Sequence, residues 1–136
     1  MAGMVSPPWF APYFASKHAV VAMSEGLAMH LNPLGIGVTV LCPGFVRTRI
    51  MESERNRPER YGPKQSVDPA SPAGAVAAQM AELVNAGLDP AEVARCVLAA
   101  IRADELYVFT HPQMRPAVEK RLAAILAAMD KAPVPR

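Results

Sequence analysis

Two residues of this sequence, Tyr13 and Lys17, could together do acid–base chemistry. They are a tyrosine and a lysine four positions apart. On a helix, this spacing places both side chains on one face, one turn apart. A free phenol releases its proton only near pH ~10, so it is a poor acid or base at neutral pH. A nearby ammonium stabilises the phenolate and makes proton exchange easier. Such a pair could exchange a proton with an alcohol or carbonyl oxygen, although the same spacing is common on ordinary helix surfaces.

The segment that carries this pair has the pattern of a helix. Apolar residues recur at helical intervals from Tyr13 to about Leu31, after an irregular proline-rich start that ends at Pro12. Asn32 and Gly35 then supply a stop signal. We therefore predict one long helix that places Tyr13 and Lys17 near its first turn.

A short β-branched run at 38–42, ended by Pro43-Gly44, predicts a buried strand of a parallel sheet. A long helix leading into such a strand is the second half of a β-α-β crossover, whose first strand this sequence does not contain. Further along, the sequence predicts a helix at 91–103, a strand at 106–110 and a closing helix at 114–129. The expected fold is therefore α/β, with two strands and three to four helices.

The connection at 45–89 mixes charges of both signs with several prolines, and it contains a helical pattern at about 73–85. A connection of this length inside a compact domain most often serves as a lid or a binding loop.

Composition narrows the class of protein. The chain has 136 residues, of which 51% are hydrophobic and 19% charged, which argues against disorder. A net charge of +2 without a basic run argues against nucleic-acid binding. No uncharged apolar stretch reaches the roughly 18 residues of a membrane span, and no secretory signal is recognisable. Cys42 and Cys96 are far apart, so we expect no disulfide framework and no metal site. A soluble, cytoplasmic protein is expected.

Two motifs in this order are specific together: YFASKHAV at 13–20, on the predicted helix, and VTVLCPGFVRT at 38–48, which spans the predicted strand and the residues after it. Together they resemble the short-chain dehydrogenase/reductase family. The resemblance covers nearly the whole of 1–136 but only the C-terminal half of the family's domain. It implies the C-terminal part of a Rossmann-type doubly wound parallel sheet, incomplete here, with 45–89 as the variable substrate loop.

The resemblance also implies a role for each matching residue. Tyr13 would be the general acid/base, and Lys17 would favour its phenolate and bind the nicotinamide ribose. Pro43-Gly44 would let the backbone approach the nicotinamide, Val46 would offer backbone groups to the carboxamide, and Thr48 would offer a hydroxyl nearby. The implied cofactor is NAD or NADP, which stay undistinguished, and the implied substrate is a small alcohol or carbonyl compound. Related enzymes are commonly dimers or tetramers, so a homo-oligomer is plausible.

The sequence departs from the family in two respects. It has no Gly-rich phosphate turn after a strand, since Gly35 and Gly37 precede one. The family's catalytic serine lies about thirteen residues before the tyrosine, which falls before Met1, and Ser6 is too close to Tyr13 to replace it. We therefore expect an enzyme fragment without its dinucleotide-binding half, inactive alone. The alternative is a non-catalytic remnant that acts only as an oligomerisation or interaction segment.

His111 follows the predicted strand at 106–110 and has two open interpretations. It could face the substrate pocket, or it could be one of the structural histidines that are more common in proteins.

Overall fold

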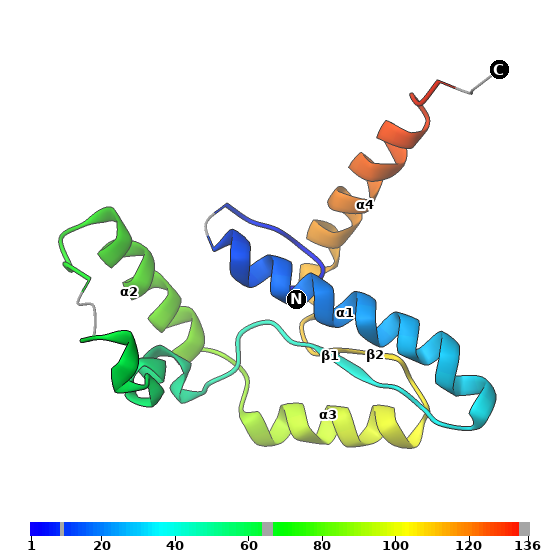
Figure 1. The fold of residues 1–136 in the computed structure, drawn as a ribbon, viewed down its shortest axis with the longest axis horizontal. Coiled ribbons are helices and arrows are strands. Elements are labelled where there is room, and N and C mark those ends of the chain that lie inside the picture. The colour runs from blue at the N-terminus through cyan, green and yellow to red at the C-terminus, as the bar shows by residue number, and fades with distance from the viewer. Residues whose placement is uncertain (9, 64–66, 134–136) are drawn as a thin grey trace. The chain divides into compact units, whose positions relative to one another are not determined.

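A computed structural model describes residues 1–8, 10–63 and 67–133. The chain divides into two compact units, a first unit of Met1–Gly44 with Arg95–Arg136 and a second unit of Phe45–Ala94. The helices and strands of the described residues follow in the order α1 (Ala11–Leu31), β1 (Val40–Cys42), α2 (Pro72–Asn85), α3 (Pro90–Arg102), β2 (Tyr107–Phe109) and α4 (Arg115–Met129), with short 3-10 turns between them (Figure 1). The α/β class predicted from the sequence is confirmed.

Helix α1 forms as the apolar pattern predicts. It begins at Ala11 with Pro12 in its first turn, where a missing N–H removes no helical hydrogen bond. A 3-10 turn at Asn32–Leu34 follows it, and Gly35 ends that turn at φ 74°. This left-handed conformation favours glycine, so Gly35 acts as the stop residue.

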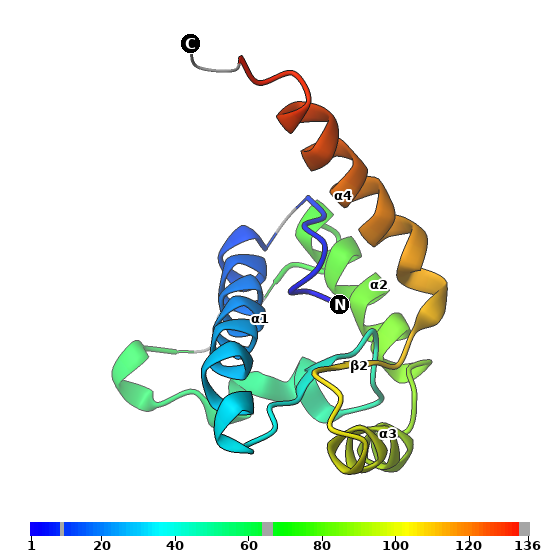
Figure 2. The same cartoon turned by 90° about the vertical axis from the view of Figure 1, so that its right-hand side faces the viewer.

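The two strands form a parallel pair in which Leu41 is the partner of Val108. Each has three residues, against five in the predictions at 38–42 and 106–110. Next to β1, the Thr39 hydroxyl donates to the Glu105 carbonyl over 3.0 Å. This side-chain bond stands beside the backbone ladder at the start of the pair. The strands lie between α1 and the part of α3 that belongs to the first unit (Figures 1 and 2).

The core of the first unit lies between α1 and the sheet. Val21 of α1 is buried together with Val40 and Cys42 of β1, and Met4 and Leu106 pack against this cluster. Since alternate residues of a strand share a face, Val40 and Cys42 point to the same side. The sequence prediction of a buried strand holds for this face.

The other face and the outer edges of the strands are less covered. Leu41, which points away from the α1 side, remains 38% exposed. Within the described ranges β1 and β2 pair only with each other, so the outer edge of each has no strand partner.

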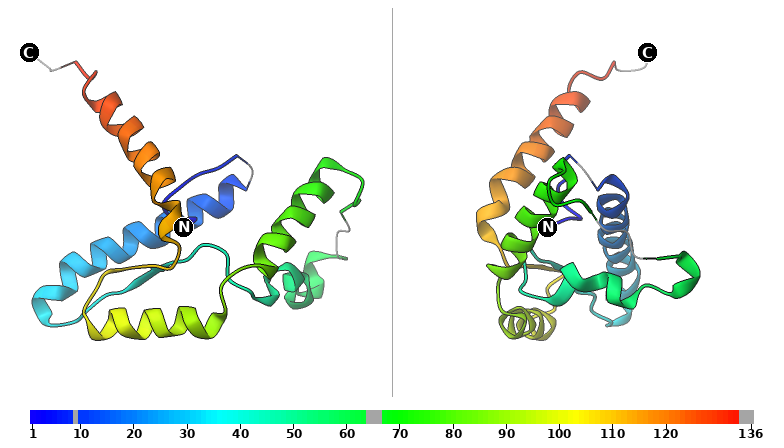
Figure 3. Two further views of the ribbon diagram at one scale, coloured as in Figure 1. Left: turned by 180° about the vertical axis from the view of Figure 1, so that it is seen from behind. Right: turned by 90° about the vertical axis from the view of Figure 1, so that its left-hand side faces the viewer.

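Helix α4 runs outward from the strands (Figure 3). None of its residues is buried, and Leu122 and Leu126 are 47% and 60% exposed. Within the part of the chain that the structure describes, Leu122 and Leu126 are therefore largely uncovered.

The second unit contains the polar connection and α2. Two 3-10 stretches, Arg49–Asn56 and Glu59–Tyr61, precede the helix and were not predicted from the sequence. Ser71 caps α2 by accepting a 3.0 Å hydrogen bond from the Gly74 N–H. The predicted helix at 73–85 is confirmed, with its start one residue earlier. No helix in the described part of the chain is long and apolar enough to span a membrane.

Candidate functional site

Helix α1 brings Tyr13 and Lys17 together on one face, as their spacing predicts. The Lys17 Nζ lies over the Tyr13 ring, 5.4 Å from its centroid, within the range of a cation–π contact. Tyr13 is 53% exposed, so its hydroxyl is open to a ligand. The helix thus places the lysine ammonium beside the tyrosine ring, on the side chain that the sequence analysis singled out.

Two neighbours fix the backbone and ring around Tyr13. Ser16 Oγ donates to the Tyr13 carbonyl over 2.7 Å, so this hydroxyl is engaged within the helix. The Phe14 ring meets the Tyr13 ring edge-on, with 5.5 Å between centroids. Neither contact uses the Tyr13 hydroxyl.

The Pro43-Gly44 bend follows directly after β1. Its Gly44 N–H donates to Nδ1 of His111 over 3.1 Å, and its Pro43 carbonyl accepts from the Met1 amine. A Cβ on Gly44 would lie 2.5 Å from His111 Cγ, a distance that no side chain could tolerate without movement. Glycine at this position is therefore required by the imidazole that packs on it.

The predicted residues of the first unit lie on elements that begin or finish toward the same end of it. The first turns of α1, which carry Tyr13 and Lys17, lie toward the end of the unit where β1 and β2 finish (Figure 1). The Pro43-Gly44 bend and His111 follow those strand ends. Parallel α/β sheets bind ligands beyond the carboxyl ends of their strands.

Val46 and Thr48 belong to the second unit. Val46 forms a parallel bridge with Leu88, made by hydrogen bonds from Arg47 N to the Leu88 carbonyl and from Leu88 N to the Phe45 carbonyl. This pattern leaves the N–H and C=O of Val46 itself without a partner among the described residues. Thr48 is exposed, and its side chain does not cap the 3-10 turn that follows it.

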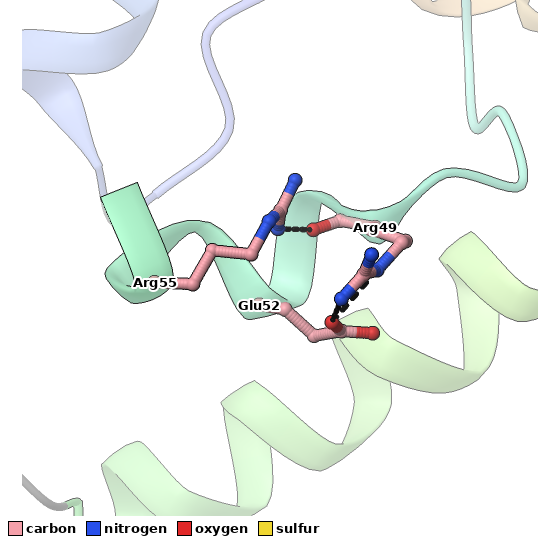
Figure 4. A network of polar contacts seen from close by, with 3 residues as sticks. All are labelled: Arg49, Glu52 and Arg55. Atoms are coloured by element: carbon pink, nitrogen blue, oxygen red, sulfur yellow. Dashed lines mark hydrogen bonds and ion pairs between the residues drawn. The ribbon is translucent and has the colours of Figure 1, made fainter. Parts of the chain in front are cut away.

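The charged residues of the second unit bond mainly to one another. Arg49 donates through Nε and Nη2 to Glu52 over 2.8 and 2.5 Å, and Arg55 donates to the Arg49 carbonyl over 2.8 Å (Figure 4). Arg47 pairs with Asp89 over 2.7 Å. These exposed contacts describe a solvated surface, in which each pair contributes about 1 kcal/mol or less.

His111 is the residue whose place the sequence analysis left open. The strand register is the signal that could have located His111. Cys42 of β1 pairs with Phe109 of β2, and two residues beyond this pair lie Gly44 and His111. Residues at equal offsets beyond paired parallel strands lie near each other. Among the described residues, no group of three or more His, Cys, Asp or Glu side chains is arranged to hold a metal ion.

Comparison with known proteins matches this chain to dehydrogenases. The short chain dehydrogenase family matches residues 1–59. The CLA biosynthesis dehydrogenase/reductase of Lactiplantibacillus plantarum is 34% identical over 136 residues, which cover 98% of this chain and 47% of that protein. The C alpha-dehydrogenase of a Sphingobium species is 29% identical over 126 residues, which cover 93% of this chain and 40% of that protein.

A solved structure agrees with these matches. A short chain dehydrogenase/reductase from Burkholderia phymatum, crystallised in complex with NAD, superposes with a TM-score of 0.81 at 35% identity. The match covers 99% of this chain and 48% of that one. The chain thus spans about half the length of the relatives it matches.

Proposed function

The chain belongs to the short-chain dehydrogenase/reductase family, and from this premise we propose that it carries the proton-transfer and nicotinamide-facing part of an NAD(P)-dependent oxidoreductase site. In such an enzyme the nicotinamide, when bound, exchanges a hydride with the carbon of an alcohol or carbonyl group. The observation that carries the proposal is the contact of the Lys17 ammonium with the Tyr13 ring, beside an exposed hydroxyl.

Tyr13 would move the proton at the reacting oxygen. The phenol would give its proton to a carbonyl oxygen during reduction, or accept one from an alcohol during oxidation. Lys17 would favour the phenolate from its position over the ring and would hold the nicotinamide ribose with its remaining N–H donors. Both roles need the two side chains on one face of α1, where they lie.

Four residues would serve the nicotinamide end of the cofactor, each by its own chemistry. Pro43-Gly44 presents backbone without a side chain on Gly44, and Val46 keeps a free N–H and C=O among the described residues. A carboxamide needs one donor and one acceptor, which Val46 offers together. Thr48 adds an exposed hydroxyl. The complex of the Burkholderia relative with NAD supports this class of cofactor without separating NAD from NADP.

We assign 45–89 as the loop that contacts a small alcohol or carbonyl substrate. The compact second unit, Phe45–Ala94, supports this assignment because it begins directly after the Pro43-Gly44 bend. The phosphate end of the dinucleotide has no matching Gly-rich turn in this sequence, so we propose that the 136-residue chain alone has no turnover.

The test uses the chain grafted onto the part of the Burkholderia relative that it does not match. The matched part of the Burkholderia relative is replaced by this chain, and NAD(P)H is followed by absorbance with a panel of alcohols and ketones. We expect turnover in the graft and none in the chain alone. Tyr13→Phe should lower kcat by roughly 10²–10⁴-fold, whereas Tyr107→Phe, which changes a phenol outside the site, should not. A folded, active graft in which Tyr13→Phe keeps its full rate would contradict the proposal.

A second candidate function rests on exposed apolar side chains. Val20, Met23 and Met29 of α1 are 50%, 66% and 82% exposed. Surface of this kind is typical of a segment that associates with itself or with an intact relative. Two measurements separate this function from the first. A remnant of this kind would self-associate in analytical ultracentrifugation, and in the graft it would bind no nicotinamide cofactor.

A further inference from the structure

His111 lies directly against the Pro43-Gly44 bend. We propose that His111 is a positioning residue for this bend: its neutral imidazole accepts the Gly44 N–H and fixes the backbone that would face the nicotinamide. The consequence for cofactor binding rests on the proposed function. The hydrogen bond to Gly44 and the tautomer of the imidazole do not depend on the proposed function. Both can be measured in this chain without a cofactor.

The sheet sets the position of His111. Cys42 and Phe109 are register partners, and two further residues on each side lead to Gly44 and His111. The His111 carbonyl then accepts from the Met114 N–H over 3.0 Å, in the 3-10 turn Pro112–Met114. Both sides of His111 are therefore anchored, by β2 before it and by this turn after it.

The hydrogen bonds define which nitrogen of His111 carries the proton. A backbone N–H can only donate, so Nδ1 must present its lone pair to Gly44 at 3.1 Å. Thr110 Oγ1 lies 2.8 Å from the same Nδ1, whose single lone pair its hydroxyl can share with the Gly44 N–H. The neutral ring consequently carries its proton on Nε2.

His18 provides an internal comparison with the opposite pattern. Its Nδ1 lies 2.9 Å from the Phe14 carbonyl, which can only accept, so this Nδ1 carries the proton. Its Nε2 is buried and has no partner within the described ranges. The two histidines of one chain should therefore show opposite tautomers.

Close packing adds to the hydrogen bond. A Cβ at Gly44 would lie 2.5 Å from Cγ, 2.6 Å from Cδ2 and 2.8 Å from Nδ1 of His111. The ring thus occupies the space that a side chain at residue 44 would need, and it limits how far the bend can rotate. Loss of the imidazole would remove both the hydrogen-bond acceptor for Gly44 and this steric restriction of the bend.

The first test is NMR on the complete chain, without any cofactor. Histidine ¹⁵N shifts should show an unprotonated Nδ1 for His111 and a protonated Nδ1 for His18. The Gly44 amide should exchange with solvent about fivefold faster in His111→Leu, which loses one hydrogen bond. His111→Asn, whose Oδ1 can accept, should exchange more slowly than His111→Leu. A protonated Nδ1 on His111, or equal Gly44 exchange in the wild type and His111→Leu, would overturn the proposal.

The second test measures the consequence in the grafted enzyme. His111→Leu should raise the KM for the nicotinamide cofactor about fivefold and lower kcat less, with His111→Asn closer to the wild type. His30→Asn, on the exposed end of α1, is the matched control and should change neither constant. Equal KM values in all variants would overturn the role in positioning. If the graft shows no turnover with any cofactor, the proposed function fails, and the NMR result still decides the state of His111.

Discussion

The Tyr107 hydroxyl donates a 2.5 Å hydrogen bond to a carboxylate oxygen of Glu25 and so joins the first residue of β2 to the middle of α1. The two residues are 82 positions apart in sequence. Because Glu25 accepts this hydrogen bond, the protonated phenol is favoured, which raises the pKa of Tyr107 to about 12. The bond therefore links α1 to β2 within the first unit, at a distance in sequence from the residues of the candidate site.

In an alkaline titration, Tyr107 should therefore lose its proton at a higher pH than an ordinary tyrosine. Absorbance near 295 nm should show a late step near pH 12, which Tyr107→Phe removes and Glu25→Gln moves to lower pH. The folded pKa lies above the unfolded value of ~10, so this stabilisation is complete below pH ~10. It is lost as the pH rises from ~10 to about 12. A single common step in the wild type would contradict the assignment.

The contact between Gly44 and His111 predicts a coupled pair of substitutions. Gly44→Ala should lower the free energy of unfolding by about 1–3 kcal/mol, because the new Cβ meets the imidazole. In a His111→Ala background the same change should cost less, which denaturant unfolding of the four proteins measures.

The matched control for that cycle is Gly26→Ala. A Cβ at Gly26, in the interior of α1, meets nothing within 4 Å, so this change should stabilise the chain by roughly 0.5–1 kcal/mol. Purely additive effects of Gly44→Ala and His111→Ala would mean that the two residues are not in contact in solution.

The two cysteines should differ in reactivity. Cys42 is 3% exposed, and burial raises the pKa of its thiol, whereas Cys96 is exposed on α3. A thiol reagent at neutral pH should therefore modify Cys96 quickly and Cys42 only after denaturation, since the thiolate is the reactive form. Peptide mapping of the labelled chain checks this, and rapid labelling of Cys42 in the folded chain would show that the core around β1 is open.

Local patterns in the sequence predicted the helices well. The apolar spacing and Pro12 defined α1 nearly to its ends, and the helix predicted at 91–103 differs from α3 by one residue at each end. The strands were predicted too long, because β-branched runs do not show how many residues find a partner. The 3-10 stretch at Arg49–Asn56 contains hydrogen bonds among its own charged side chains, and no apolar periodicity marks it in the sequence.

The candidate site also has one part that the sequence predicted and one part that it did not. The contact of Lys17 with Tyr13 follows from helical spacing alone. The partner of Gly44 depends on the register between β1 and β2, which are separated by more than 60 residues. The sequence therefore predicted the bend but not the imidazole that holds it.

The most direct measurement of the central claim is a double-mutant cycle on kcat in the grafted enzyme. If Lys17 acts on chemistry through the Tyr13 phenol, Lys17→Met should lower kcat in the wild-type background and change it little in Tyr13→Phe. Losses that multiply in the double variant would mean that the two side chains act independently, and would contradict the account of a phenol activated by the amine one turn away.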